Sequence, residues 1–130
     1  MIEFNSSAFY KLKPVDNVST YGKMIKPMFV EGEENLHTFK ALKDAVVFTN
    51  RRIIAINIQG VAGNEVDYTT LPYSKIQAFS VETVEGENAA SFNLDSELQL
   101  WFKGLGVVRF NFTPNCNIGE IAQFISNQIL

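Results

Sequence analysis

The chain has 130 residues and a mass of 14.6 kDa, the size of a single domain. Hydrophobic residues make up 46% of the chain, which is enough for a core. Charged residues make up 19%, which is too little for a disordered chain or a coiled coil. With 14 acidic residues against 11 Lys and Arg, the formal net charge is −3. This acidic balance argues against nucleic-acid binding and against attachment to an anionic membrane.

Three absences in the sequence indicate the cellular compartment. Cys116 is the only cysteine, so it has no partner for an intrachain disulfide or a Cys-x-x-Cys metal site. The start, Met1–Asn5, lacks the basic residues and apolar run of a signal peptide. Apolar runs stay far below the roughly 18 residues of a membrane span. We therefore expect a cytoplasmic protein.

The first 33 residues differ from the rest, and we predict that they form an N-terminal extension with a short helix. Pro14 suits a helix start, and the spacing of the apolar residues that follow predicts a helix over 15–26. A polar turn at 31–35 marks the boundary to a domain that covers 34–130.

Seven segments rich in β-branched and aromatic residues follow, and each is bounded by turn residues. The predicted strands are 36–42, 45–49, 52–58, 65–71, 75–82, 97–103 and 107–112. The links at 43–44, 50–51, 59–64 and 104–106 are short enough for hairpins, so the strands are expected to pair antiparallel. Four aromatic residues of the last two predicted strands are interpreted as core or interface residues: Trp101, Phe102, Phe110 and Phe112.

The end of the chain returns to helical spacing. Asn117 is a suitable N-cap, and Glu120 follows at the spacing of a capping box. One apolar stripe follows: Ile118, Ile121, Ala122, Phe124, Ile125 and Ile129. We predict that this amphipathic helix closes the mouth of the bent sheet.

The sequence contains few residues that could form a catalytic site. His37 is the only histidine, and no Gly-x-Ser-x-Gly motif supplies a nucleophile, so no catalytic set, metal site or cofactor site is predicted. His37 is interpreted as a partly exposed strand residue and Cys116 as a structural residue before the last helix. Asp95 and Glu97 are two residues apart, a spacing that places both on one face of a strand. We interpret this face as solvated. The alternative is that the paired carboxylates act in acid–base catalysis or bind a cation.

Basic residues gather near the first two predicted hairpins. Lys40 and Lys43 flank the first, and Arg51 and Arg52 form the tip of the second. If the hairpins lie together, these four side chains could hold an anionic group. The alternative is that they only keep the turns soluble.

Several short blocks carry a resemblance to a known family. They are Gly32-Glu33, Phe39-Lys40, Val47 to Arg52, Gln59-Gly60, Pro72 to Ile76, Phe79 to Thr83, Leu94 to Leu98, and Trp101. In these blocks and in its element order, the chain resembles the small, uncharacterised single-domain members of the bacterial pleckstrin-homology-like family. The resemblance implies a mainly β fold, a split barrel of seven antiparallel strands (4+3) closed by the C-terminal helix. Residues 84–91 are longer than the family's turn at this place.

The resemblance also implies a function. Family members look like non-enzymatic modules that assemble into cyclic homo-oligomers through sheet edges and present a polar surface at protomer junctions to protein partners. The polar blocks shared with the family define the candidate interaction surface: Thr49, Asn50, Arg51, Arg52, Asp95, Ser96 and Glu97. Arg52 and Glu97 are expected to pair across a junction, with little effect on folding of the single domain. The alternative function is an anionic-lipid or phosphoinositide-type headgroup binder that uses Lys40, Lys43, Arg51 and Arg52.

Overall fold

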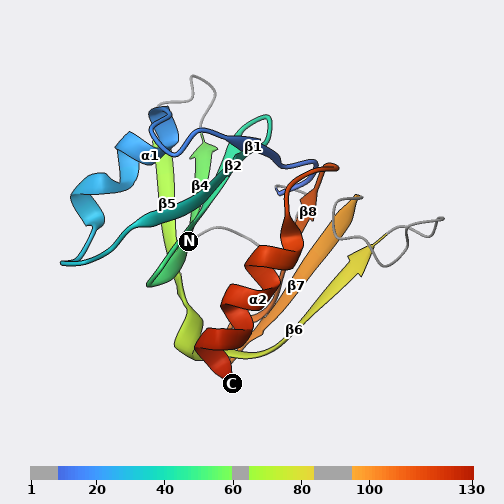
Figure 1. Ribbon diagram of the computed structural model, residues 1–130. Coiled ribbons are helices and arrows are strands. Elements are labelled where there is room, and N and C mark those ends of the chain that lie inside the picture. Colours follow the sequence, from blue (N-terminus) through green and yellow to red (C-terminus); the bar gives the residue numbers. More distant parts are fainter. Residues whose placement is uncertain (1–8, 60–64, 84–94) are drawn as a thin grey trace.

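The computed structural model describes residues 9–59, 65–83 and 95–130 (Figure 1). In chain order the elements are β1 (Lys13–Val15), α1 (Thr20–Ile25), the 3-10 helix η1 (Lys26–Met28), β2 (Asn35–Lys40), β3 (Asp44–Thr49), β4 (Arg52–Gln59), β5 (Glu65–Pro72), the 3-10 helix η2 (Tyr73–Lys75), β6 (Ile76–Thr83), β7 (Ser96–Phe102), β8 (Gly106–Phe112) and α2 (Ile118–Ile129).

The strands form two antiparallel sheets. One has the order β1-β2-β3-β4-β5 and the other the order β6-β7-β8. The predicted fold is confirmed, because the four-strand and three-strand sets and the closing helix are all present. The short strand β1 adds a fifth strand to the first sheet. Pro14 lies in this strand, which is at a sheet edge, where a residue without an N–H is tolerated.

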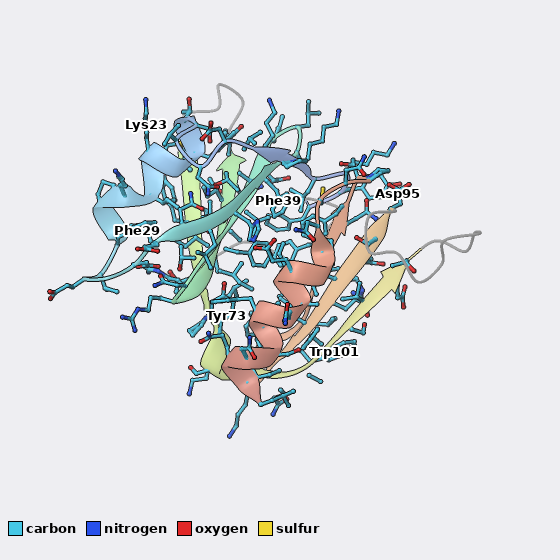
Figure 2. The ribbon with its side chains drawn as sticks, in the orientation of Figure 1. Lys23, Phe29, Phe39, Tyr73, Asp95 and Trp101 are labelled. Carbon is cyan, nitrogen blue, oxygen red and sulfur yellow. The ribbon has the colours of Figure 1, made fainter. Side chains whose placement is uncertain are left out.

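The main core lies between the two sheets and under α2 (Figure 1). Its centre is a group of phenylalanine rings in edge-to-face contact, with centroids 4.9 Å apart for Phe39 and Phe112 and 6.0 Å apart for Phe39 and Phe48. Figure 2 shows Phe39 in this central position. Such contacts add to the free energy gained from burying the rings, so the aromatic residues join the two halves of the split barrel.

A second, smaller core covers the other face of the first sheet. Ile25 of α1 packs there against residues of β3 and β4, namely Ala45, Val47, Ile54 and Ile56. As a result β3 is buried along its whole length. This explains why its sequence is almost continuously apolar and does not alternate.

The N-terminal helix is shorter than predicted. The expected helix over 15–26 is observed only at α1 and η1, because residue 15 belongs to β1 and Pro27 lies in the 3-10 turn. Gly22 is buried in α1, and a Cβ atom there would lie 1.9 Å from the Asn17 carbonyl oxygen. The glycine therefore allows the helix to approach the preceding loop closely.

The C-terminal helix buries Ile118, Ile121 and Ile125 as the stripe predicts. Phe124 is half-buried and meets the Tyr73 ring of η2 at a centroid distance of 5.3 Å. The predicted capping box is wrong. Asn117 adopts a left-handed conformation with φ of 54°, and its side-chain amide donates to the Glu120 carboxylate instead of capping a backbone N–H.

Trp101 faces away from the core. Its partners across the strands are Ala78 and Val107, and 38% of its surface is exposed, whereas Phe102, Phe110 and Phe112 are buried. The connections expected at 60–64 and 84–91 lie outside the described residues. Among the described helices, none has the length and apolar character needed to cross a bilayer.

Candidate functional site

Arg52, at the start of β4, is held by an ion pair within the chain. Its Nε and Nη2 atoms lie 2.9 Å from Oε2 and Oε1 of Glu33, and Nη2 also donates to the Met28 carbonyl at 2.6 Å. The Glu33 side chain is fully buried. Burial raises the pKa of Glu33, but hydrogen bonds from Arg52, Thr49 and the Val30 N–H outweigh it and lower the pKa to about 2.

The other residues of the first polar block also bond within the chain. The Thr49 hydroxyl donates to Glu33 at 2.7 Å and accepts the backbone N–H groups of Arg51 and Arg52. The buried Tyr73 hydroxyl donates to the Thr49 carbonyl at 2.7 Å, and its pKa is raised by burial and by the Glu33 charge. The β3–β4 turn is therefore one hydrogen-bonded unit with Glu33.

Asn50 ties the same turn to the segment before β2. Its side chain accepts the Glu34 N–H at 2.7 Å and donates to the Gly32 carbonyl at 2.9 Å. Within the chain, Glu33, the Met28 carbonyl and Thr70 accept hydrogen bonds from Arg52, so the expectation that Arg52 has little effect on folding has to be corrected. Its pairing with Glu97 across a junction between copies stays a prediction. Of this block, Arg51 alone is exposed.

The second polar block borders a shallow hollow of about 190 Å³ at the start of β7. The hollow is lined by Glu82, Thr83, Asp95, Ser96, Glu97 and Asn111. Glu82 and Glu97 are directly opposite each other on β6 and β7. Ser96 is 3% exposed, and its hydroxyl has no hydrogen-bond partner within the described part of the chain. The arrangement concentrates negative charge at one end of the second sheet.

The structure does not bring the two polar blocks together within one chain. Tyr73, which touches the first block through Thr49, and Asp95, in the second, lie at opposite ends of the second sheet in Figure 2. Among the described residues, no hydrogen bond or ion pair connects the blocks.

The four predicted anion contacts are separated in the same way. Lys40 and Lys43 flank the β2–β3 hairpin, whereas Arg51 and Arg52 follow β3 at its other end. A six-residue strand spans about 20 Å, so the four side chains do not form one cluster. Lys40 instead lines a hollow of about 510 Å³ with four residues of the N-terminal segment and two of the β2–β3 connection, namely Tyr10, Lys11, Lys13 and Tyr21, and Ala41 and Leu42.

Sequence reasoning missed Glu33 and Lys13. Glu33 was part of an expected polar turn, and its partner lies 19 residues away, a distance at which sequence periodicity carries no signal. Lys13 preceded an expected helix, but β1 places it directly opposite Lys40. The sequence feature that could have predicted β1 is Pro14, because proline is tolerated in edge strands.

His37 and Cys116 occupy structural positions. His37 Nε2 lies 3.5 Å from Glu120 Oε1, and the imidazole stacks on Phe39. Cys116 is 4% exposed, and burial raises the pKa of its thiol, which disfavours the reactive thiolate. Within residues 9–59, 65–83 and 95–130, no group of three or more His, Cys, Asp or Glu side chains is arranged to hold a metal ion.

The two antiparallel sheets and the closing helix define a pleckstrin-homology-like domain. The chain belongs to the bacterial PH domain family, whose model matches residues 3–129. It is 40% identical over 101 residues to Bacillus subtilis (strain 168) uncharacterized protein YjqA, covering 76% of this chain and 77% of that protein. It is 25% identical over 111 residues to uncharacterized protein YozO of the same organism, covering 85% of this chain and 91% of that protein.

Two solved structures agree with this assignment. A DUF1696 family protein with a pleckstrin-homology domain from Shewanella loihica PV-4 superposes with a TM-score of 0.74 at 29% identity, over 93% of this chain and 99% of that chain. A pleckstrin homology domain from Shewanella amazonensis SB2B gives a TM-score of 0.61 at 30% identity, over 88% of this chain and 90% of that chain. Together with the family match, these structures establish the pleckstrin-homology-like fold of this chain.

Proposed function

We propose that this protein is a non-enzymatic interaction module that assembles with copies of itself into a ring through its sheet edges and presents a polar surface at the junctions to a protein partner. The observation that carries the proposal is the edge strand β6. It is eight residues long, and among the residues that the structure describes it has a neighbouring strand, β7, on one side only. A long edge of this kind offers unpaired backbone N–H and C=O groups to another chain.

At the other edge of the same sheet, the last residues of β8 are already paired with the N-terminal segment, which makes β6 the better candidate. Leu12 forms a bridge with Phe112 at the end of β8, and its N–H donates to the Asn111 carbonyl at 2.9 Å. The Asn111 N–H donates to the Phe9 carbonyl at 3.0 Å. The N-terminal segment thus uses hydrogen-bonding groups on β8 that a second chain would need.

The outward face of the second sheet supports the same proposal. Trp101 is exposed between Ala78 and Val107, and exposed aromatic side chains are enriched at protein interfaces. The second polar block, Asp95 to Glu97, lies toward the other end of β7, as Figure 2 shows for Asp95 and Trp101. Arg51, the exposed member of the first block, is the remaining charged side chain proposed for contact with a partner.

Light scattering of the purified protein at micromolar concentration tests the assembly. We expect the mass of an oligomer, that is, several times the 14.6 kDa of a single chain. Ala78→Lys places a charge on exposed edge strand β6, a common natural protection against edge pairing, and should lower that mass. Gln128→Lys adds the same charge to an exposed position of α2 and should leave the mass unchanged. A wild-type protein that stays monomeric would refute the proposal.

A further inference from the structure

The outward face of the second sheet carries three rows of side chains that differ in chemistry. Leu98, Leu100 and Phe102 of β7 point into the core, so the residues that alternate with them point outward. The strand register places the outward residues of β6, β7 and β8 in these rows: Glu82, Glu97 and Asn111, then Ser80, Gln99 and Arg109, then Ala78, Trp101 and Val107. Neighbouring rows are about 7 Å apart, the length of two residues of a strand.

The first row borders the hollow at the start of β7, whose lining also includes Asp95 and Ser96. Glu82 and Glu97 are directly opposite each other there, an unfavourable arrangement of like charges. Ser96 is 3% exposed, and its hydroxyl lacks a hydrogen-bond partner among the residues that the structure describes. Buried hydroxyl groups normally have such a partner. The hollow therefore offers unused acceptors to a guanidinium group, which carries several N–H donors in one plane.

The chain's own Lys11 lies beside this hollow without occupying it. The Lys11 N–H donates to Asn111 Oδ1 at 3.1 Å, whereas its ammonium group lies 5.5 Å from the centroid of the Tyr10 ring. In the described ranges, no ion pair joins a Lys or Arg side chain to Glu82, Asp95 or Glu97. A cation for the hollow therefore has to come from another molecule.

The next two rows change from basic to apolar. Arg109 is exposed, and it lies directly opposite Gln99, which is uncharged. Trp101 is 38% exposed between Ala78 and Val107. Along β7 the face thus passes from acidic to basic to apolar over four residues, or about 14 Å. Figure 2 shows the two ends of this face at Asp95 and Trp101.

We propose, on the basis of the protein partner proposed above, that this face binds an extended segment of the partner with an arginine, an acidic residue and an aromatic residue at alternate positions. An extended chain points every second side chain in the same direction, at the same spacing of about 7 Å as the rows. The arginine donates to Glu97 and Glu82, the acidic residue pairs with Arg109, and the aromatic ring packs on Trp101. The contacts are made by side chains on the sheet face and leave the edge of β6 free.

Fluorescence of Trp101 tests this binding directly, because Trp101 is the only tryptophan of the chain. The probes are the peptides acetyl-Arg-Ser-Glu-Ser-Phe-amide and acetyl-Phe-Ser-Glu-Ser-Arg-amide, one for each chain direction. The matched control for each exchanges its arginine and glutamate and keeps composition and charge. We expect one probe to shift the emission to shorter wavelength in a saturable manner, with an affinity about tenfold above that of its control.

Variants of the face test the contacts one by one. Glu97→Gln should weaken the probe about tenfold. It should not lower the denaturation midpoint, because it removes the repulsion with Glu82. Arg109→Glu should weaken the probe and favour a peptide in which lysine replaces the glutamate. The matched controls are Glu31→Gln and Lys23→Glu, at exposed positions outside the face, and they should bind the probe like the wild type.

The results separate this proposal from ring formation. Equal affinity of both probes and their charge-exchanged controls, no binding of any of these peptides, or an unchanged preference in Arg109→Glu would overturn the binding face. An assembled wild type with one of these results would keep the ring and lose the face. A monomeric wild type that binds a probe with the expected preference would lose the ring and keep the face.

Discussion

Arg52 and Glu33 form a two-point ion pair that fastens the segment before β2 to the β3–β4 turn. Both hydrogen bonds measure 2.9 Å, and the exposed fractions of the side chains are 15% and 0%. Thr49 and the Met28 carbonyl complete the hydrogen bonding around the pair. A buried pair of this kind is stabilising relative to the loss of one partner, because the remaining charge would be left buried without compensation.

The first prediction concerns Arg52→Ala. This change leaves the Glu33 carboxylate buried without its cation, so the free energy of unfolding should fall by about 3–5 kcal/mol. Urea denaturation measures the change. Arg51→Ala is the matched control, because Arg51 is exposed and its removal should alter stability by less than about 0.5 kcal/mol. Equal midpoints for the two variants would show that the ion pair does not support the fold.

The second prediction is a pH dependence of stability that arises from Glu33. Its pKa falls from an ordinary 4.5 to about 2 in the folded protein, so the folded state binds the proton less tightly than the unfolded state. The contribution to stability is therefore present above pH 4.5 and is lost as the pH falls toward 2. The difference in pKa corresponds to about 3 kcal/mol.

The comparison with Glu33→Gln isolates this effect. The variant should be less stable than the wild type at neutral pH, and the gap between their urea midpoints should narrow as the pH falls through this range. Asp44 makes the opposite contribution to the pH dependence of stability, since burial raises its pKa despite a hydrogen bond from Asn57. Asp44 is present in both proteins, so its contribution cancels in the difference. A gap that does not change with pH contradicts the prediction.

The third prediction concerns Gly22→Ala. In an exposed helix interior this change stabilises by about 1 kcal/mol, because alanine has the higher helix propensity. Here the new Cβ would lie 1.9 Å from the Asn17 carbonyl oxygen, so the backbone has to move and the unfolding temperature should fall. Lys23→Ala, at the next and exposed position, should leave it nearly unchanged. A gain in unfolding temperature for Gly22→Ala would refute the close approach.

The fourth prediction ranks two positions of α2. Ile125 is completely buried, so Ile125→Ala should cost about 2–5 kcal/mol. Phe124 is half-buried against Tyr73, and Phe124→Ala should cost less than the 3–5 kcal/mol or so that is typical of a fully buried phenylalanine. Gln128→Ala, on the exposed side, is the control for helix propensity. Thermal unfolding monitored by circular dichroism gives the order, and a larger loss for Phe124→Ala would contradict it.

The sequence by itself determined the strand pattern, the antiparallel connections and the C-terminal helix. These features depend on residues close together in the chain: the runs rich in β-branched and aromatic residues, the short links and the apolar stripe with Ile121 and Ile125. The resemblance of the short sequence blocks and of the element order to a known family then indicated the split barrel, which the structure and the family match confirm.

Only the tertiary structure decided what the polar residues of those blocks do. Arg52 had the features of a surface residue in the sequence, and it lies against Glu33 because the segment before β2 folds back on the β3–β4 turn. Lys13 and Lys40 are 27 positions apart, and the pairing of β1 with β2 places them directly opposite. Charge interactions depend on distance in space, and local sequence patterns specify that distance only within one helix or hairpin.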